Sequence, residues 1–124
     1  MEAQLGELGK RLDRYPNFAV DIAPRVGRLT LQPRDQVRAF ILKYQDRILY
    51  GSDLFFDSEA RHKDVSAMWE RQYLLDWRYA FSSDDMFDYH GHQVEGLNLP
   101  LPVLEKLYHD NALRWIPGID ASAP

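Results

Sequence analysis

The chain has 124 residues, 45% of them hydrophobic and 27% charged, so it suits one domain and is too apolar for a disordered or collagen-like chain. Nineteen acidic residues against fifteen basic ones give a net charge of −4, which disfavours binding to nucleic acid because that needs a basic surface. The absence of cysteine excludes disulfides, thiolate nucleophiles and zinc fingers. No signal pattern opens the chain, and no apolar run approaches the ~20 residues that span a membrane. We therefore expect a cytoplasmic protein that acts on something small and contacts neither nucleic acid nor membrane.

The first half of the chain predicts two helices and two strands in alternation. Residues 2–14 carry leucines at helical spacing and read as a helix that ends at a proline. The apolar run 18–23 predicts a buried strand, and 24–32 predicts a loop. A second helix opens at Pro33, since proline suits a first helical turn. The run 47–53 then predicts a second short strand that ends in Gly-Ser-Asp.

The connection between these two strands has the length of a right-handed crossover, so we expect the strands to be parallel. Two parallel strands do not make a stable sheet alone, because their edges and both of their faces need cover. The chain is therefore expected either to pair with something or to be one piece of a larger sheet.

The second half of the chain predicts mostly helix. Aromatic residues at helical spacing predict a helix over 62–81. Residues 89–92 and 96–102 read as loops, and a last helix is expected from 103 to 113. Residues 121–124 read as a tail, which leaves a single domain over residues 1–120.

Three phrases carry a resemblance to a known family. Leu12–Ala23 resembles the helix and seventh strand of the amidohydrolase-related proteins of the amidohydrolase 2 type, which are metal-dependent hydrolases with a TIM-barrel fold. Lys43–Asp53 resembles their eighth strand, and Leu101–Arg114 resembles their last helix. The resemblance implies an α/β fold class: a partial TIM barrel, made of the last two parallel strands with their helices and the C-terminal helices.

The resemblance also implies a function, but some of the residues that the family uses for it have no counterpart in this chain. In that family the first, fifth and sixth strands carry histidine ligands for a divalent metal, most often zinc, and this chain has no counterpart of those strands. We therefore expect part of a metal-dependent hydrolase or decarboxylase for a small-molecule substrate, inactive as an isolated chain. The rest would come from a missing N-terminal barrel part or from a homo-oligomer.

Two other interpretations stay open. In the first, the chain is a non-catalytic oligomerising or binding module, and a second copy covers its strand edges and aromatic residues. In the other it is an independent small α/β domain, which requires further strands within residues 84–99. Four or more paired strands within the chain would favour this last interpretation.

Asp53 is the candidate catalytic residue and metal ligand. It follows a predicted strand, and active-site residues of TIM barrels lie at the carboxyl ends of strands. The resemblance implies that this aspartate binds the metal and accepts a proton from bound water, two roles that a carboxylate can combine. From the residues alone, Gly51-Ser52-Asp53 reads instead as a turn and helix-cap signal.

Arg25 is the candidate for substrate binding, because a guanidinium binds a carboxylate through two hydrogen bonds. A structural ion pair between Arg25 and Asp21 is the favoured reading of both residues.

Other chemically suggestive residues read as structural. His90-Gly91-His92 has the spacing of a metal pair but follows no predicted strand, so we expect a solvated loop. His62 and His109 are expected on the surface, with Asp110 off the face of His109. Phe55 and Phe56 could line a pocket by their position after Asp53. The recurrence of Trp69, Tyr73 and Trp77 predicts core or interface packing.

Overall fold

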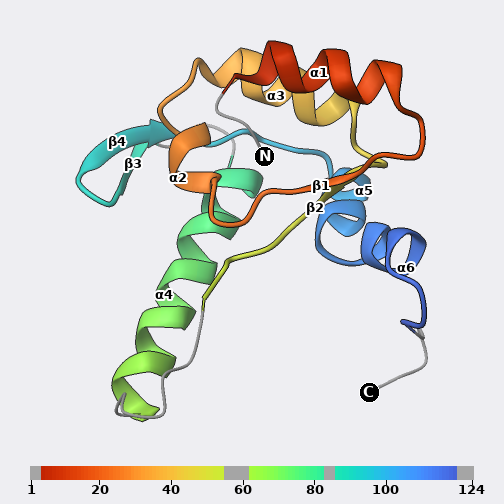
Figure 1. Ribbon diagram of the computed structural model, residues 1–124. Coiled ribbons are helices and arrows are strands. Elements are labelled where there is room, and N and C mark those ends of the chain that lie inside the picture. The colour runs from red at the N-terminus through yellow and green to blue at the C-terminus, as the bar shows by residue number, and fades with distance from the viewer. Residues whose placement is uncertain (1–3, 55–61, 83–85, 120–124) are drawn as a thin grey trace.

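The computed structural model describes residues 4–54, 62–82 and 86–119 (Figure 1). The described elements alternate between helix and strand in the first half of the chain and end in a run of helices. In chain order they are α1 (Leu5–Arg14), β1 (Val20–Asp21), α2 (Val26–Leu29), α3 (Arg34–Lys43), β2 (Ile48–Leu49), α4 (His62–Phe81), β3 (Met86–Tyr89), β4 (His92–Glu95), α5 (Leu101–Glu105), the π-helical turn η1 (Lys106–Asp110) and α6 (Asn111–Trp115). The C-terminal residues 120–124 lie outside the described residues, and so does the expected tail.

The predicted crossover is confirmed, because β1 and β2 pair in parallel with Val20 opposite Ile48. The paired strands are shorter than the apolar runs that predicted them. The backbone amide of Val20 donates to the carbonyl of Arg47, just before β2, over 2.9 Å, and that of Ile22 donates to Leu49 over 3.0 Å. The ladder stops at Pro24, which has no amide hydrogen to donate. The expected loop 24–32 contains instead the short helix α2, whose Val26 and Leu29 are buried.

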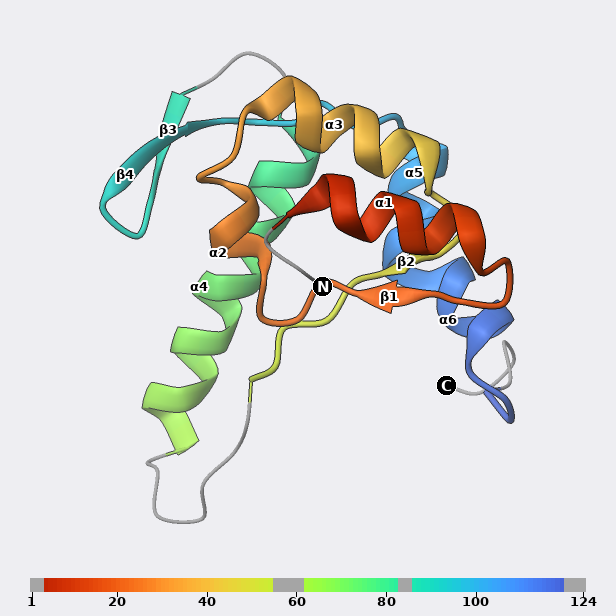
Figure 2. The same ribbon diagram turned by 45° about the horizontal axis from the view of Figure 1, so that its top comes forward.

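The helices α1 and α3 lie side by side over one face of the strand pair (Figures 1 and 2). Leu8 and Leu12 of α1 and Val37 of α3 are almost fully buried with Ile48 of β2, so the helical apolar stripes form this core as their spacing predicts. The hydroxyl of Tyr44 ties the two helices together by donating to Asp13 over 2.9 Å and to the carbonyl of Gly9 over 3.2 Å.

The edge of β2 that faces away from β1 is covered by the C-terminal helices. The amide of Tyr50 donates to the carbonyl of Leu107 over 2.8 Å. The side-chain amide of Asn111 donates to the carbonyls of Gln45 and Ile48. The expectation of open strand edges is therefore wrong for β2, because backbone and side-chain groups of η1 and α6 take the place of a neighbouring strand.

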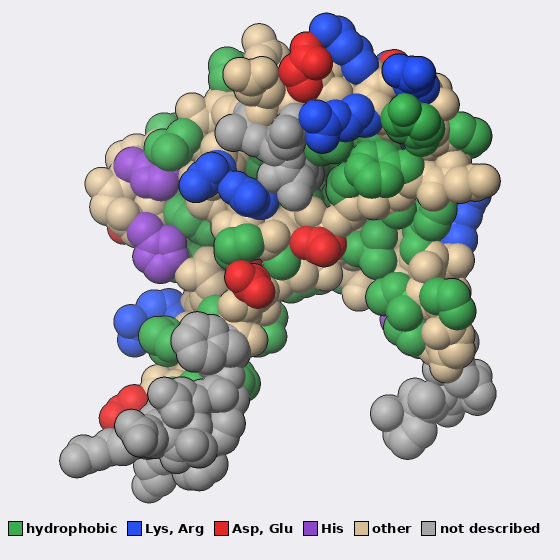
Figure 3. Space-filling view, in the orientation of Figure 1, with side chains coloured by type: hydrophobic (Ala, Val, Ile, Leu, Met, Phe, Trp, Pro, Cys, Tyr) green, Lys and Arg blue, Asp and Glu red, His purple; other side chains and the backbone are tan. Residues whose placement is uncertain are grey.

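Among the described residues, a hollow of about 570 Å³ lies along the strand pair. Small residues such as Ala19, Ala23 and Gly51 line it together with larger ones, among them Leu49 and Trp115. Figure 3 shows the surface hollowed between α4 and the C-terminal helices. Within the described part of the chain no further strand adds to β1 and β2, so the structure shows a small mixed α/β fold and no barrel.

The expectation of a loop at residues 89–92 is wrong, since β3 and β4 form an antiparallel hairpin there. Phe87 and Tyr89 alternate with exposed residues and are buried, which is the pattern of a strand with one face on the core. The turn residues His90 and Gly91 both have positive φ, 47° and 93°, as a two-residue hairpin turn of type I′ requires. Strands thus exist within 84–99, and with β1 and β2 the described residues contain four paired strands, the number that favours an independent small α/β domain. They form two separate sheets, so the sheet of β1 and β2 stays two-stranded.

Candidate functional site

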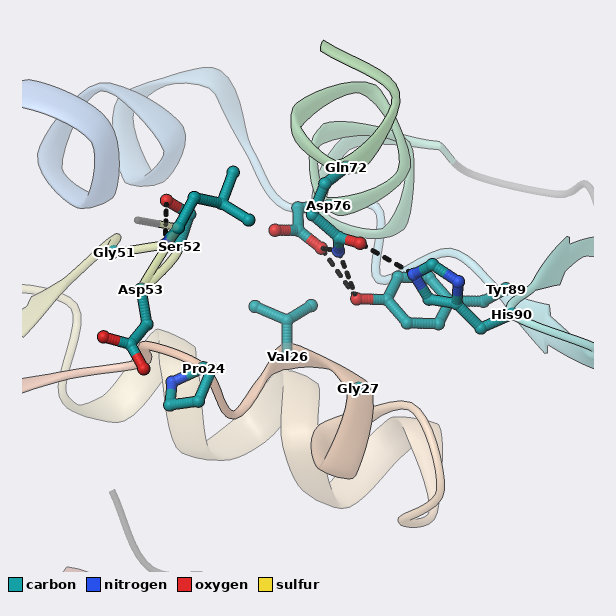
Figure 4. Close-up of a pocket in the computed structure, with 11 residues that line it drawn as sticks. Pro24, Val26, Gly27, Gly51, Ser52, Asp53, Gln72, Asp76, Tyr89 and His90 are labelled. Carbon is teal, nitrogen blue, oxygen red and sulfur yellow. Dashed lines mark hydrogen bonds between the residues drawn. The ribbon is translucent and has the colours of Figure 1, made fainter. Parts of the chain in front are cut away.

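A pocket of about 320 Å³ opens where β2 ends (Figure 4). Four segments form it: the residues after β2, the turn into α2, the middle of α4, and the end of β3. Its lining residues are Pro24, Val26, Gly27, Gly51, Ser52, Asp53, Leu54, Gln72, Asp76, Tyr89 and His90. The carboxyl ends of both parallel strands therefore lead into one pocket, which is where ligands bind in sheets of this kind.

Asp53 lies at the rim of this pocket because the chain bends sharply after β2. Gly51 packs so closely on β1 that an added Cβ would lie 2.9 Å from the Cβ of Ala23. Asp53 itself has a φ of 55°, in the left-handed region that aspartate tolerates better than most residues. Its side chain is exposed, and no hydrogen bond or ion pair joins it to another described residue.

Arg25 lies in the turn that enters the pocket, but its side chain is not part of the lining. Its neighbours Pro24 and Val26 line the pocket, and Arg25 itself is half-buried at the start of α2. Asp21 accepts a hydrogen bond from the amide of Ala23 over 3.0 Å instead of pairing with Arg25. The structure thus shows no ion pair between these two described residues, and the role of Arg25 stays a prediction.

The pocket contains a second carboxylate, Asp76, that the sequence analysis missed. Asp76 is only 4% exposed and accepts three hydrogen bonds, two of them from tyrosines. The hydroxyls of Tyr50 and Tyr89 donate to it over 2.8 and 2.7 Å, and the amide of Gln72 donates over 2.8 Å. The sequence did contain a signal for Asp76, because it lies one helical turn before Ala80 on the buried face of α4. An aspartate on such a face is rarely buried unless other groups bond to it.

Both tyrosines keep their protons in this environment. Burial raises the pKa of the Tyr50 hydroxyl far above its usual value of 10.0, and the neighbouring Asp76 carboxylate raises it further. Burial and Asp76 act on the pKa of Tyr89 in the same direction. Both hydroxyls are therefore hydrogen-bond donors throughout the physiological range, and they complete the shell around Asp76.

The two histidines of the hairpin turn do not form a metal pair. His90 donates through Nε2 to the side-chain oxygen of Gln72 over 2.7 Å, because the Gln72 amide nitrogen is turned toward Asp76. His92 lies 2.9 Å from the hydroxyl of Thr30, beside α2. The two imidazoles thus connect the hairpin to α4 through Gln72 and to the end of α2 through Thr30. The expected solvated loop is instead a hairpin turn whose histidines bond to other elements.

The remaining histidines give no metal centre in the described residues. The side chain of His62 lies outside the described residues, as do Phe55 and Phe56. His109 is exposed as expected, but its Nδ1 lies 2.9 Å from Asp110, so the expectation that these side chains do not meet is wrong. Adjacent side chains can meet because they lie at the surface and are free to turn toward each other.

The aromatic residues of α4 do not form a core. Tyr73 is 45% and Trp77 39% exposed, while Trp69 is half-buried. Trp77 stacks on Phe81 and contacts the edge of Tyr108. The prediction of core packing is wrong for Tyr73 and Trp77 because α4 buries the neighbouring face that carries Asp76, and the prediction of interface packing stays open.

The fold and the pocket define an α/β chain with an exposed aspartate, Asp53, in the segment that follows the parallel strand β2. The family model for "Amidohydrolase" matches residues 1–117, so the chain belongs to the amidohydrolase family, whose members typically depend on a metal. Comparison with curated proteins and with solved structures gave no match. None of the described helices is long and apolar enough to cross a membrane.

The described residues do not fit a complete metal centre. Zinc sites take three or four protein ligands, and no group of three histidine, aspartate or glutamate side chains that could hold a metal occurs among the described residues. Asp76 is enclosed by its three donors, so Asp53 is the one other carboxylate among the described residues that line the pocket.

Proposed function

We propose that this chain is part of a metal-dependent hydrolase or decarboxylase that acts on a small molecule, and that Asp53 is its contribution to the catalytic centre. The observation that carries this proposal is the place of Asp53, at the carboxyl end of β2 and on the rim of a pocket, in a chain that matches the amidohydrolase family over residues 1–117. Catalytic residues of parallel α/β folds lie at this end of the strands.

The other metal ligands then come from outside the described residues, either from a second copy of the chain or from further strands that pair with β1, because η1 and α6 cover the outer edge of β2. Two features support this completion. The strands β1 and β2 border a hollow of about 570 Å³, and the small residues Ala19, Ala23 and Gly51 in its lining leave room for another segment. Arg25 keeps its proposed role as the partner of a substrate carboxylate, since it lies in the turn next to the pocket.

Activity measurements on the purified chain test the proposal. The chain with added zinc is expected to hydrolyse amides and esters, and to decarboxylate small acids, no faster than buffer with zinc. The variant Asp53→Asn serves as the comparison, and Asp21→Asn is the control because Asp21 lines the hollow along β1 and β2, outside the pocket. If the chain alone is active and Asp53→Asn is not, the proposal that the catalytic centre is completed from elsewhere is contradicted. If Asp53→Asn is as active as the parent chain, the catalytic role of Asp53 is contradicted.

A second candidate function, a non-catalytic oligomerising or binding module, is favoured by one observation. α4 exposes a large apolar surface that includes Leu74, Trp77 and Phe81, at 60%, 39% and 55% exposure. Surfaces of this kind mark interaction sites in soluble proteins. Light scattering after size exclusion separates the candidates: a stable monomer excludes the oligomerising module, whereas a dimer that persists in Asp53→Asn and lacks any activity supports it.

A further inference from the structure

The buried carboxylate of Asp76 joins three segments that are far apart in the sequence. Tyr50 directly follows β2, Tyr89 ends β3, and Gln72 lies one turn before Asp76 on α4. All three donate to the same carboxylate over distances of 2.7 to 2.8 Å. Gln72, Asp76 and Tyr89 line the pocket, and Tyr50 directly precedes its lining residue Gly51, so Asp76 joins three of the four segments that form the pocket. Figure 4 shows the bonds of Asp76 with Gln72 and Tyr89.

A carboxylate is a costly way to hold a core together. Asp76 is 4% exposed, and within the described part of the chain no lysine, arginine or histidine forms an ion pair with it. Burying a charge without a counter-ion is unfavourable unless hydrogen bonds replace the lost water, and here three neutral donors do so. A similarly shaped apolar contact would stabilise the core at lower cost, so the position of this charge calls for a role beyond packing.

The geometry points to Asp76 as the positioning residue for Asp53: through Tyr50 and Tyr89 it fixes the end of β2 and the β3–β4 hairpin against α4, and so holds the pocket rim on which Asp53 lies. Tyr50 is three residues before Asp53, and the intervening Gly51 is packed against Ala23. A displacement at Tyr50 is therefore passed to Asp53, whose left-handed backbone persists only while its surroundings hold it.

This inference rests on the proposed function in one respect, namely that Asp53 is the residue worth positioning. The test of the positioning role needs neither metal nor substrate, so its result is independent of whether the proposed function is correct. The readout is the set of backbone amide resonances of Ser52, Asp53 and Leu54 in the nitrogen–proton spectrum of the full chain, together with the hydrogen-exchange rates of these amides.

The informative variant is Tyr89→Phe, because it removes one hydroxyl from Asp76 on a different segment from Asp53. We expect the amide resonances of Ser52 to Leu54 to shift and their exchange to accelerate. The matched control is Tyr44→Phe, which also removes a tyrosine–aspartate hydrogen bond, to Asp13 over 2.9 Å, in a part of the fold outside the pocket. The control is expected to lower the unfolding temperature without moving these resonances.

The conservative variant Asp76→Asn separates positioning from general stability. Its side-chain oxygen can still accept from Tyr89 and Gln72, so we expect a smaller resonance shift than in Asp76→Ala. Adding Tyr89→Phe to Asp76→Ala is expected to cause almost no further shift, because the link is already broken. Equal effects of Tyr89→Phe and Tyr44→Phe on the three amides, or additive shifts in the double variant, would overturn the inference. If Asp76→Ala does not fold, the comparison of the two tyrosine variants alone decides.

Discussion

Asn111 donates its side-chain amide to the backbone carbonyl of Ile48 over 2.8 Å, across 63 residues of sequence. The same amide donates to the carbonyl of Gln45 over 2.6 Å. Asn111 is 2% exposed, so these contacts replace water at the outer edge of β2. One asparagine of the last helix thus occupies the edge at which a further strand would pair, and it keeps β2 in place above the pocket.

Replacing Asn111 is expected to destabilise the chain clearly. The variant Asn111→Ala leaves two buried carbonyls without donors, which costs about 2 kcal/mol or more in the free energy of unfolding. Urea unfolding followed by circular dichroism measures this loss. Asn17→Ala is the control, since Asn17 is exposed, and it is expected to change stability by less than about 0.5 kcal/mol. Equal stability of the two variants would show that the edge of β2 is not held by Asn111.

Two glycine-to-alanine variants are expected to act in opposite directions. A Cβ at Gly96 would collide with the backbone and side chain of Ser82, so Gly96→Ala is expected to cost about 1–3 kcal/mol through overpacking. Gly6 lies in α1 with nothing near its missing Cβ, so Gly6→Ala is expected to stabilise by up to about 1 kcal/mol. Thermal unfolding of both variants checks the pair. A Gly96→Ala variant as stable as the parent would show that the contact between α4 and the segment after β4 is loose.

Stability is expected to fall at alkaline pH because of four tyrosines. Burial raises the pKa of Tyr50, Tyr79, Tyr89 and Tyr108 above the ordinary 10.0. Below pH 10 these groups are protonated in both states, so their contribution to stability is intact. Above that pH the unfolded tyrosines lose their protons while the folded ones keep them, so the free energy of unfolding decreases with rising pH.

Ultraviolet absorption of tyrosinate measured together with circular dichroism tests this. Part of the tyrosinate signal is expected to appear only with the loss of helical signal. Full ionisation of all tyrosines in a still-folded chain would contradict the burial of this cluster.

The hairpin histidines are expected to matter for the hairpin and not for metal binding. His90→Ala removes the contact with Gln72 and is expected to accelerate amide exchange in β3 and β4. His109→Ala is the control, because His109 is exposed and lies in a hydrogen bond with its neighbour Asp110, away from the hairpin. If His90→Ala lowers the affinity for zinc and leaves the amide exchange of β3 and β4 unchanged, His90 is a metal ligand and not a structural contact of the hairpin.

The sequence predicted those parts of the fold that depend on short stretches of chain. The apolar runs around Val20 and Ile48 predicted the two strands, the crossover length predicted their parallel direction, and the aromatic spacing predicted the full extent of α4. Asp53 was singled out by the resemblance of Lys43–Asp53 to the family's eighth strand, because the residues alone read as a turn and helix-cap signal. The structure places Asp53 in the lining of a pocket, and its catalytic role stays a proposal.

The missed features depend on contacts between distant residues. Asp76 reads as an ordinary helical acid until Tyr50, 26 residues earlier, and Tyr89, 13 residues later, are seen to converge on it. The partners of Asn111 are equally remote. The hairpin has a local signal, since Phe87, Tyr89 and Val94 alternate as in strands and Gly91 suits the turn between them.

Zinc stoichiometry tests the central claim, that this chain gives one carboxylate to a metal centre completed elsewhere, most directly. The purified chain is dialysed with zinc, passed through gel filtration to remove loosely held ions, and analysed for zinc by mass spectrometry beside its Asp53→Asn variant. A single available carboxylate does not hold zinc through this procedure, so both samples are expected to contain well below one zinc per chain. One zinc per chain retained by the parent would show that the chain contains a complete ligand set and would contradict the account.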